Sequence, residues 1–241
     1  MAAEPLRTEV SDGVLTVTID RPESKNALSL AMRQRLEALC AEVDGRDDID
    51  VMILTGVDPV FCAGADTKEI ARLGASLPPT NPGAALRAVD KPVICAVNGP
   101  CVTGGLEVAL SCDFIVASER ATFADTHARL GVLPRWGLSA LLPAAVGVRR
   151  AKEMTSTGRF VTASEALQFG LANRVVAHEE LAAAALAIAQ SIRGANQPAV
   201  RASFGLYDRG AGAKLAESLD TELEVATGWV VDLSNFGQRP G

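Results

Sequence analysis

Two short stretches rich in small residues have the composition of a site that stabilises negative charge on an oxygen atom. The first is residues 61–69 (FCAGADTKE), and the second is residues 98–107 (NGPCVTGGLE). Small residues let a ligand approach the backbone closely, and the first turn of a helix leaves N–H groups without partners inside the helix. Two such loops side by side would aim two N–H donors at one oxygen, which is the geometry of an oxyanion hole.

Strands and helices are predicted to alternate around these loops. Residues 14–19 are rich in β-branched side chains and alternate in polarity, which is typical of a strand. Residues 29–43 place apolar side chains at helical spacing, and Ser29 is suited to cap the first turn. Three short buried strands are predicted at residues 51–55, 93–97 and 114–117. Helices between strands imply crossover connections, so the sequence predicts an α/β fold.

Several motifs, taken in order and at their spacing, resemble the crotonase (enoyl-CoA hydratase/isomerase) superfamily. They are residues 20–22 (DRP) with 26–28 (NAL), residues 64–66 (GAD), the turn at 98–99 (NG), the helix start at 104–107 (GGLE) and residues 130–134 (LGVLP). The likeness extends from about residue 14 to about residue 197. It implies a spiral of repeated β-β-α units with a C-terminal helical segment.

The resemblance also implies a domain organisation and an assembly. We expect the crotonase-like spiral core over residues 1–196 and a C-terminal helical oligomerisation segment over residues 197–241. In the family this last region packs against the core and builds a trimer. A homotrimer or hexamer is therefore the expectation.

By the same resemblance, the backbone N–H groups of Ala65 and Gly104 bind the thioester carbonyl oxygen of an acyl-CoA. Glu107 follows Gly104 by one helical turn, which places its carboxylate on the side of the bound carbonyl. The family uses the matching Glu to activate water or to move a proton at the acyl carbons. The alternative is a first-turn carboxylate that merely complements the helix dipole. The predicted substrate or coenzyme A contacts are Lys25, Ala27, Ala63, Asp66, Thr67, Lys68, Gly105 and Trp136.

The chain departs from the family pattern at His127. Hydratases with two catalytic carboxylates read Phe-Gly-x-Pro-Glu here, whereas residues 123–127 read FADTH, so His127 stands at the second Glu. An imidazole with an ordinary pKa near 6.5 suits a second acid/base group, and a neutral structural His is the alternative. Asp125 is the weaker candidate, because an extended chain would point it to the opposite face. Trp136 replaces a small residue and either reshapes the acyl pocket or packs in the core.

Composition excludes several other classes of protein. The net charge of −6 and the eight Phe and Tyr residues offer neither a basic face nor stacking platforms for nucleic acid. Five Cys without a C-x-x-C spacing indicate free thiols in a reducing cytoplasm, and they predict no disulfide framework and no metal site. No apolar run is long enough to span a membrane. No cofactor is expected, because coenzyme A enters as the substrate thioester.

Three functions remain open from the sequence. The first is reversible hydration of a trans-2-enoyl-CoA to a 3-hydroxyacyl-CoA, with Glu107 as the main acid/base group and His127 assisting. The second is double-bond isomerisation or another reaction of the same fold, because these reactions share the demand for a stabilised enolate or oxyanion. The third is a non-catalytic acyl-CoA binding protein, which the His127 substitution favours. Residues 74–83 form either an acyl-chain lid or an ordinary surface connection.

Overall fold

A computed structural model describes residues 6–76 and 78–228 of the chain, and every structural statement below refers to them. Its centre is a six-stranded sheet in the order β1-β2-β3-β4-β6-β9. The strands are β1 (Leu6–Ser11), β2 (Val14–Ile19), β3 (Val51–Gly56), β4 (Val93–Val97), β6 (Phe114–Ser118) and β9 (Arg174–Val176). The first two strands form an antiparallel hairpin, and the remaining neighbours pair in parallel.

A second sheet of three strands lies beside the first. It consists of β5 (Pro100–Val102), β7 (Thr122–Ala124) and β8 (Val161–Thr162). Two isolated bridges, Leu28 with Ala65 and Cys62 with Cys101, continue its pairing toward the start of the chain. The chain therefore passes from a strand of the large sheet to a strand or bridge of the small one and then to a helix. This repeat confirms the predicted β-β-α spiral and the α/β class.

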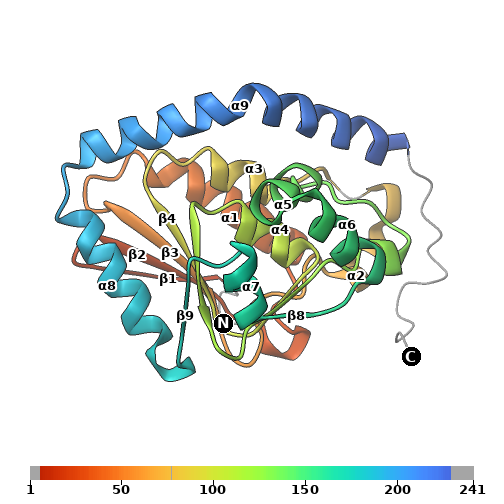
Figure 1. Ribbon diagram of the computed structural model, residues 1–241, viewed down its shortest axis with the longest axis horizontal. Helices are drawn as coiled ribbons and strands as arrows, with labels where there is room; N and C mark the ends of the chain where they lie inside the picture. Colours follow the sequence, from red (N-terminus) through yellow and green to blue (C-terminus); the bar gives the residue numbers. More distant parts are fainter. Residues whose placement is uncertain (1–5, 77, 229–241) are drawn as a thin grey trace.

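Helices surround the two sheets (Figure 1). The α-helices are α1 (Leu30–Val43), α2 (Thr67–Leu73), α3 (Pro82–Arg87), α4 (Gly104–Leu110), α5 (Leu138–Val146), α6 (Val148–Thr157), α7 (Ala163–Phe169), α8 (Leu181–Arg193) and α9 (Gln197–Gly228). Four short 3-10 helices occupy Pro22–Ser24, Gly74–Ser76, Ala128–Leu130 and His178–Glu180. Helix α9 runs along the outside of the molecule and contacts α5. It accounts for residues 197–228 of the predicted C-terminal segment, and residues 229–241 lie outside the described part.

The central strands β3 and β4 are apolar on both faces, as expected for parallel strands that are covered by helices on each side. Leu15, Val17 and Leu54 belong to the main core, together with the apolar face of α1. On the other face, side chains such as Ile53 and Ile94 pack against α8 in a second cluster. The burial of both faces explains why strands β3 and β4 read as continuous apolar runs.

The local signals for α1 and for the first hairpin are both present in the chain. Ser29 accepts a hydrogen bond from the Met32 N–H, so the predicted N-cap is confirmed. Strand β1 was not predicted, although Asp12 and Gly13 have the sequence of a hairpin turn that would join a strand to β2. Both residues have positive φ angles, 45° and 71°, as a two-residue hairpin turn of Asp-Gly type requires.

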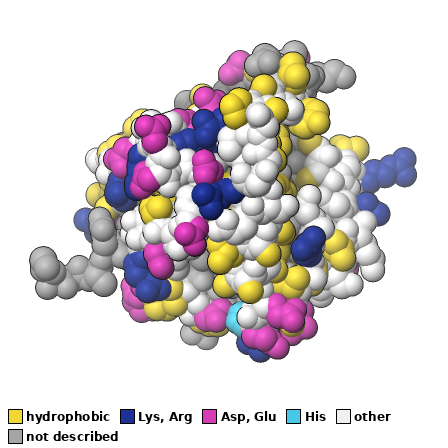
Figure 2. Space-filling view, turned by 90° about the vertical axis from the view of Figure 1, so that its left-hand side faces the viewer, with side chains coloured by type: hydrophobic (Ala, Val, Ile, Leu, Met, Phe, Trp, Pro, Cys, Tyr) yellow, Lys and Arg dark blue, Asp and Glu magenta, His cyan; other side chains and the backbone are white. Residues whose placement is uncertain are grey.

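The surface shown in Figure 2 does not gather one kind of charge. Lys and Arg side chains are interspersed with Asp and Glu side chains across this face. A nucleic-acid-binding face would concentrate positive charge, and this face lacks that pattern. Within residues 6–76 and 78–228, no helix has the length and apolar character needed to cross a bilayer.

Replacement of Gly105 by Ala should destabilise the fold. A Cβ atom at Gly105 would lie 2.3 Å from the carbonyl oxygen of Cys62, so α4 and the loop before α2 would have to separate. Overpacking of this kind typically costs about 1–3 kcal/mol of unfolding free energy, measurable by urea denaturation. The matched control is Gly45→Ala, whose added Cβ meets its nearest atom at 3.7 Å. Equal stability of the two variants would contradict the close packing of α4.

Candidate active site

The two glycine-containing loops meet at the start of α4. A Cβ atom on Gly64 would lie 2.9 Å from the backbone nitrogen of Gly104, and one on Gly104 would lie 3.3 Å from the nitrogen of Ala65. Gly64 also has a φ of +94°, which disfavours any residue with a side chain. Only residues without a Cβ permit this approach, so the small residues serve to bring two backbone amides together.

The amides of Ala65 and Gly104 are directed away from other backbone partners. Leu28 donates to Gly64 O at 2.8 Å and accepts from the Asp66 N–H at 3.0 Å, so it bonds the residues on either side of Ala65. The N–H of Ala65 therefore faces away from Leu28 in this parallel bridge. Gly104 is the first residue of α4, and a first-turn N–H has no acceptor within its own helix.

Thr103 turns the chain into α4 with an uncommon backbone conformation. Its φ is +56°, in the region where residues other than glycine are rare. Its N–H donates to Ala124 O at 2.8 Å, and its hydroxyl shares a short hydrogen bond with the hydroxyl of Thr126. These contacts tie the second loop to the segment that carries His127. Sequence reasoning missed Thr103, because its role depends on a contact with a distant segment.

Glu107 is only 2% exposed, and hydrogen bonds hold its buried carboxylate in place. One carboxylate oxygen, Oε1, accepts from the Trp136 N–H at 2.7 Å and from the Leu138 N–H at 3.4 Å. The other oxygen, Oε2, lies 3.4 Å from Nε2 of His127. The structure therefore brings Glu107 and His127 together, as the sequence predicted for two residues of one site.

Asp125 completes this cluster, because the stretch that would have to be extended to point it to the opposite face is not extended. Its Oδ1 lies 2.7 Å from Nδ1 of His127 and accepts the His127 N–H at 3.1 Å. Its Oδ2 accepts from the Thr155 hydroxyl at 2.6 Å. The prediction assumed an extended chain, whereas β7 ends at Ala124 and His127 has helical angles of −53° and −48°. The resulting turn brings Asp125 and His127 to the same side.

The two carboxylates control the charge of His127. Burial alone would lower the pKa of His127, but the hydrogen bonds and charges of Asp125 and Glu107 outweigh it and raise the pKa to about 9. Burial would likewise raise the pKa of Asp125, yet the bond and charge of His127 and the Thr155 hydroxyl hold it below its ordinary value. His127 is therefore an imidazolium between two carboxylates at neutral pH.

Three of the predicted binding residues have structural partners of their own. The Asp66 carboxylate caps α2 by accepting from the Lys68 and Glu69 N–H groups, and it pairs with Arg21 at 2.6 Å. Gly105 is buried against Cys62, as described above. Trp136 lies against the second loop, because a Cβ on Gly104 would be 2.7 Å from its ring. The Trp136 indole also donates to the carbonyl of Thr80 at 2.9 Å.

The remaining predicted contacts line two adjacent backbone segments. The Ala63 N–H donates to the carbonyl of Lys25 at 3.1 Å, which joins the first loop to the turn before α1. The side chains of Lys25 and Lys68 are exposed, whereas Ala27, Ala63 and Thr67 are half-buried. The two lysines are thus available to a polyanion, and their role as coenzyme A contacts stays a prediction.

The thiols beside the loops are not poised as nucleophiles. Burial raises the pKa of Cys62 to about 12 and also holds the pKa of Cys101 well above its ordinary value. Reactive cysteines instead have lowered pKa values and partial exposure. Both side chains are buried, in agreement with their predicted role as small packing groups.

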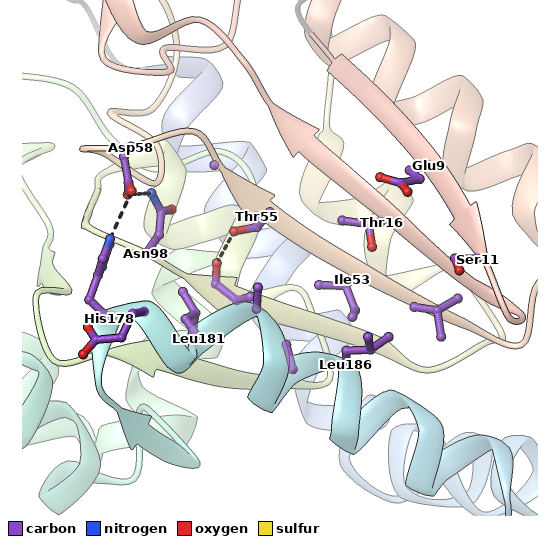
Figure 3. Close-up of a pocket in the computed structure, with 16 residues that line it drawn as sticks. Glu9, Ser11, Thr16, Ile53, Thr55, Asp58, Asn98, His178, Leu181 and Leu186 are labelled. Atoms are coloured by element: carbon purple, nitrogen blue, oxygen red, sulfur yellow. Dashed lines mark hydrogen bonds and ion pairs between the residues drawn. The ribbon is translucent and has the colours of Figure 1, made fainter.

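A separate groove lies on the other side of the large sheet, beneath α8 (Figure 3). It has a volume of about 480 Å³, and side chains such as Ile53, Leu181 and Leu186 line it. At one end, His178 contacts Asp58 at 3.0 Å. No predicted site residue lines this groove, so the candidate chemistry is on the opposite side of the sheet.

Comparisons with known proteins agree with this architecture. The sequence model of the enoyl-CoA hydratase/isomerase family matches residues 9–230. The probable peroxisomal enoyl-CoA hydratase 1 of Arabidopsis thaliana is 36% identical over 219 residues, which are 90% of this chain and 83% of the relative. A solved enoyl-CoA hydratase from Mycobacterium tuberculosis H37Rv is 49% identical with a TM-score of 0.87, covering 94% of this chain and 96% of that one.

A more distant relative has the same fold. The solved enoyl-CoA hydratase/isomerase of Pseudoalteromonas atlantica T6c is 29% identical, with a TM-score of 0.88 over 97% of this chain and 94% of that one. The chain therefore belongs to the enoyl-CoA hydratase/isomerase family, which confirms the crotonase resemblance drawn from its motifs.

The ring protons of His127 should titrate by NMR with a midpoint at about pH 9. Asp125→Asn should move this midpoint down, because it removes the negative charge beside the imidazolium and weakens the hydrogen bond to Nδ1. The chain has two histidines, so a His178→Gln background leaves one titrating ring to observe. Asp58→Asn, beside His178, is the control that should leave the His127 midpoint unchanged. A wild-type midpoint near 6.5 would contradict the paired arrangement.

The same pairing should make folding stability depend on pH. The folded pKa of His127, about 9, lies above the unfolded value near 6.5, so its contribution is fully present below about pH 6.5. That contribution should be lost as the pH rises through 9. Urea denaturation from pH 6 to 10 should show this decline in the wild type and a smaller one in His127→Gln. Identical slopes in both proteins would argue against it.

Proposed function

We propose that this protein catalyses reversible hydration of a trans-2-enoyl-CoA to a 3-hydroxyacyl-CoA. The observation that carries the proposal is the buried cluster of Glu107, His127 and Asp125 one helical turn from two adjacent backbone amides. Membership of the enoyl-CoA hydratase/isomerase family and relatives named as enoyl-CoA hydratases support the same reaction.

In this proposal the amides of Ala65 and Gly104 form the oxyanion hole. Attack of water on C3 moves the double-bond electrons toward the thioester, and the carbonyl oxygen gains negative charge. Two fixed N–H donors stabilise that charge without reorganising, and one such donor is typically worth roughly 10²–10³ in rate. The close approach of the two loops at Gly64 and Gly104, which a side chain at either position would prevent, supports this assignment.

Proton movement is assigned to Glu107 and His127. As the water oxygen bonds to C3, Oε2 of Glu107 accepts one water proton, and the imidazolium of His127 supplies the proton that C2 gains. A proton then passes from Glu107 back to His127, whose Nε2 is 3.4 Å from Oε2, and both groups return to their starting states. Asp125 keeps Nε2 directed at Glu107 through its bond to Nδ1. His127 thereby replaces the second carboxylate of related hydratases.

Isomerisation of an enoyl-CoA is the second candidate. Glu107 is almost fully buried, and a shielded carboxylate is suited to moving one proton between two carbons of the acyl chain. Both reactions require the same oxyanion hole, and they differ in whether water enters the product. Product analysis therefore separates them.

Further properties are proposed from family membership and the exposed side chains. Lys25 and Lys68 would contact the phosphate groups of coenzyme A, and the backbone at Ala27 and Ala63 would meet its adenine. Self-assembly would give a homotrimer or hexamer. The five free thiols support a cytoplasmic location.

Glu107→Gln should lower the hydration rate of crotonyl-CoA by about 10²–10⁴-fold, because it removes a general base. His127→Gln should lower it by about 10²-fold for loss of the proton donor. Loss of the enoyl thioester absorbance measures hydration, and Glu42→Gln is an exposed charge-matched control.

Two results would overturn the hydratase assignment. Isomerisation of a 3-enoyl-CoA by a protein that does not hydrate crotonyl-CoA would establish the isomerase instead. Binding of acyl-CoA without any turnover by the wild type would leave a non-catalytic binding protein.

A further inference from the structure

The backbone amides at the start of α5 donate hydrogen bonds to two buried carboxylates from distant parts of the chain. Along residues 136–139, the first and third N–H groups donate to Oε1 of Glu107 at 2.7 and 3.4 Å. The second and fourth donate to the two oxygens of Glu222 at 2.9 Å each. Glu107 of α4 and Glu222 of α9 therefore accept hydrogen bonds from alternate amides of one turn.

This turn needs acceptors from outside its own segment. Gly137 precedes α5 with a φ of +116° and offers no side chain to cap the helix. The first N–H groups of a helix lack intrahelical partners, and leaving them unbonded in a buried place is costly. The positive end of the helix dipole also favours negative charge there. Glu222, only 9% exposed, thus takes the place of a missing local cap.

Other contacts fix α9 on the same turn. A Cβ atom on Gly137 would lie 3.3 Å from Cδ2 of Leu219, so α9 packs closely on this glycine. Arg87 donates to the carbonyl of Trp136 at 3.0 Å. Burial lowers the pKa of Arg87, and the charges of Glu222 and Glu107 oppose that decrease. The guanidinium therefore balances the two carboxylates that share the turn.

We propose that Glu222 is a positioning residue for Glu107. By holding the second and fourth amides, Glu222 keeps residues 136–139 in the conformation whose first and third amides bind Oε1 of Glu107. Oε2 of Glu107 then stays directed at His127. Docking of α9 and orientation of the acid/base carboxylate are two consequences of one shared turn. The catalytic part of this inference rests on the proposed function of Glu107.

The kinetic test compares Glu222→Gln with Glu224→Gln. Glu224 lies on the exposed side of the same helix, so the pair matches the change in charge. Glu222→Gln should lower kcat for crotonyl-CoA about 10-fold through misplacement of Glu107, and KM should change less than about twofold. Glu224→Gln should leave both constants unchanged. Near-ultraviolet circular dichroism at the assay temperature establishes that each variant is folded.

A second measurement does not depend on turnover. Hydrogen exchange of the amides at 136–139 should become about 10-fold faster at the first and third positions in Glu222→Gln, although these amides bond Glu107. The reciprocal variant, Glu107→Gln, should accelerate exchange at the second and fourth positions. Reciprocal effects identify coupling, because a purely local role would change exchange only at the two amides that bond to the altered side chain.

Several outcomes would overturn the proposal. An unchanged kcat in folded Glu222→Gln would exclude a positioning role in the reaction. Exchange that rises only at the amides of the altered carboxylate would exclude the coupling. If the wild type shows no turnover, the proposed hydratase function fails, whereas the exchange pattern still decides whether Glu222 and Glu107 share the turn.

Discussion

The placement of charge in an apolar interior is the constraint on which this structure depends. Glu107, Asp125 and His127 lie inside the protein, where an unpaired ion is strongly disfavoured. The fold meets this constraint by placing the imidazolium between two carboxylates and by directing backbone amides at Glu107. Removal of one partner leaves the others buried and uncompensated. The cluster is therefore held as a unit, and its orientation follows from that requirement.

A second constraint is steric and concerns the backbone. The loops before α2 and α4 approach so closely that Gly64 and Gly104 cannot carry side chains without contact with the other loop. The absence of a side chain at Gly105 similarly lets the Cys62 carbonyl pack closely against α4. Backbone packing thus fixes the two amides relative to each other, and the hydrogen bonds of Thr103 fix them relative to the charged cluster. Rigid polar groups in a fixed arrangement are what stabilisation of a developing oxyanion requires.

The sequence predicted the features that repeat locally. The β-branched runs predicted β2, β3, β4 and β6, the Ser29 cap predicted the start of α1, and the glycine motifs predicted both loops. It also predicted that Glu107 and His127 belong to one site. It did not predict the position of Asp125, because the turn after β7 depends on tertiary contacts. The contribution of Glu222 was equally inaccessible, since no local pattern connects a residue of α9 with amides 83 and 85 positions earlier.

The bond between α9 and the start of α5 has a consequence for how the protein is made. The N-terminal end of a chain emerges from the ribosome first, and domains generally fold in that order during synthesis. The glycine loops, His127 and both sheets precede residue 197, whereas Glu222 is synthesised after all of them. A nascent chain that lacks α9 has two unbonded amides at the turn that holds Glu107. The arrangement of the acid/base carboxylate is thus completed only after α9 has been synthesised, so it depends on a helix that follows both sheets in the chain.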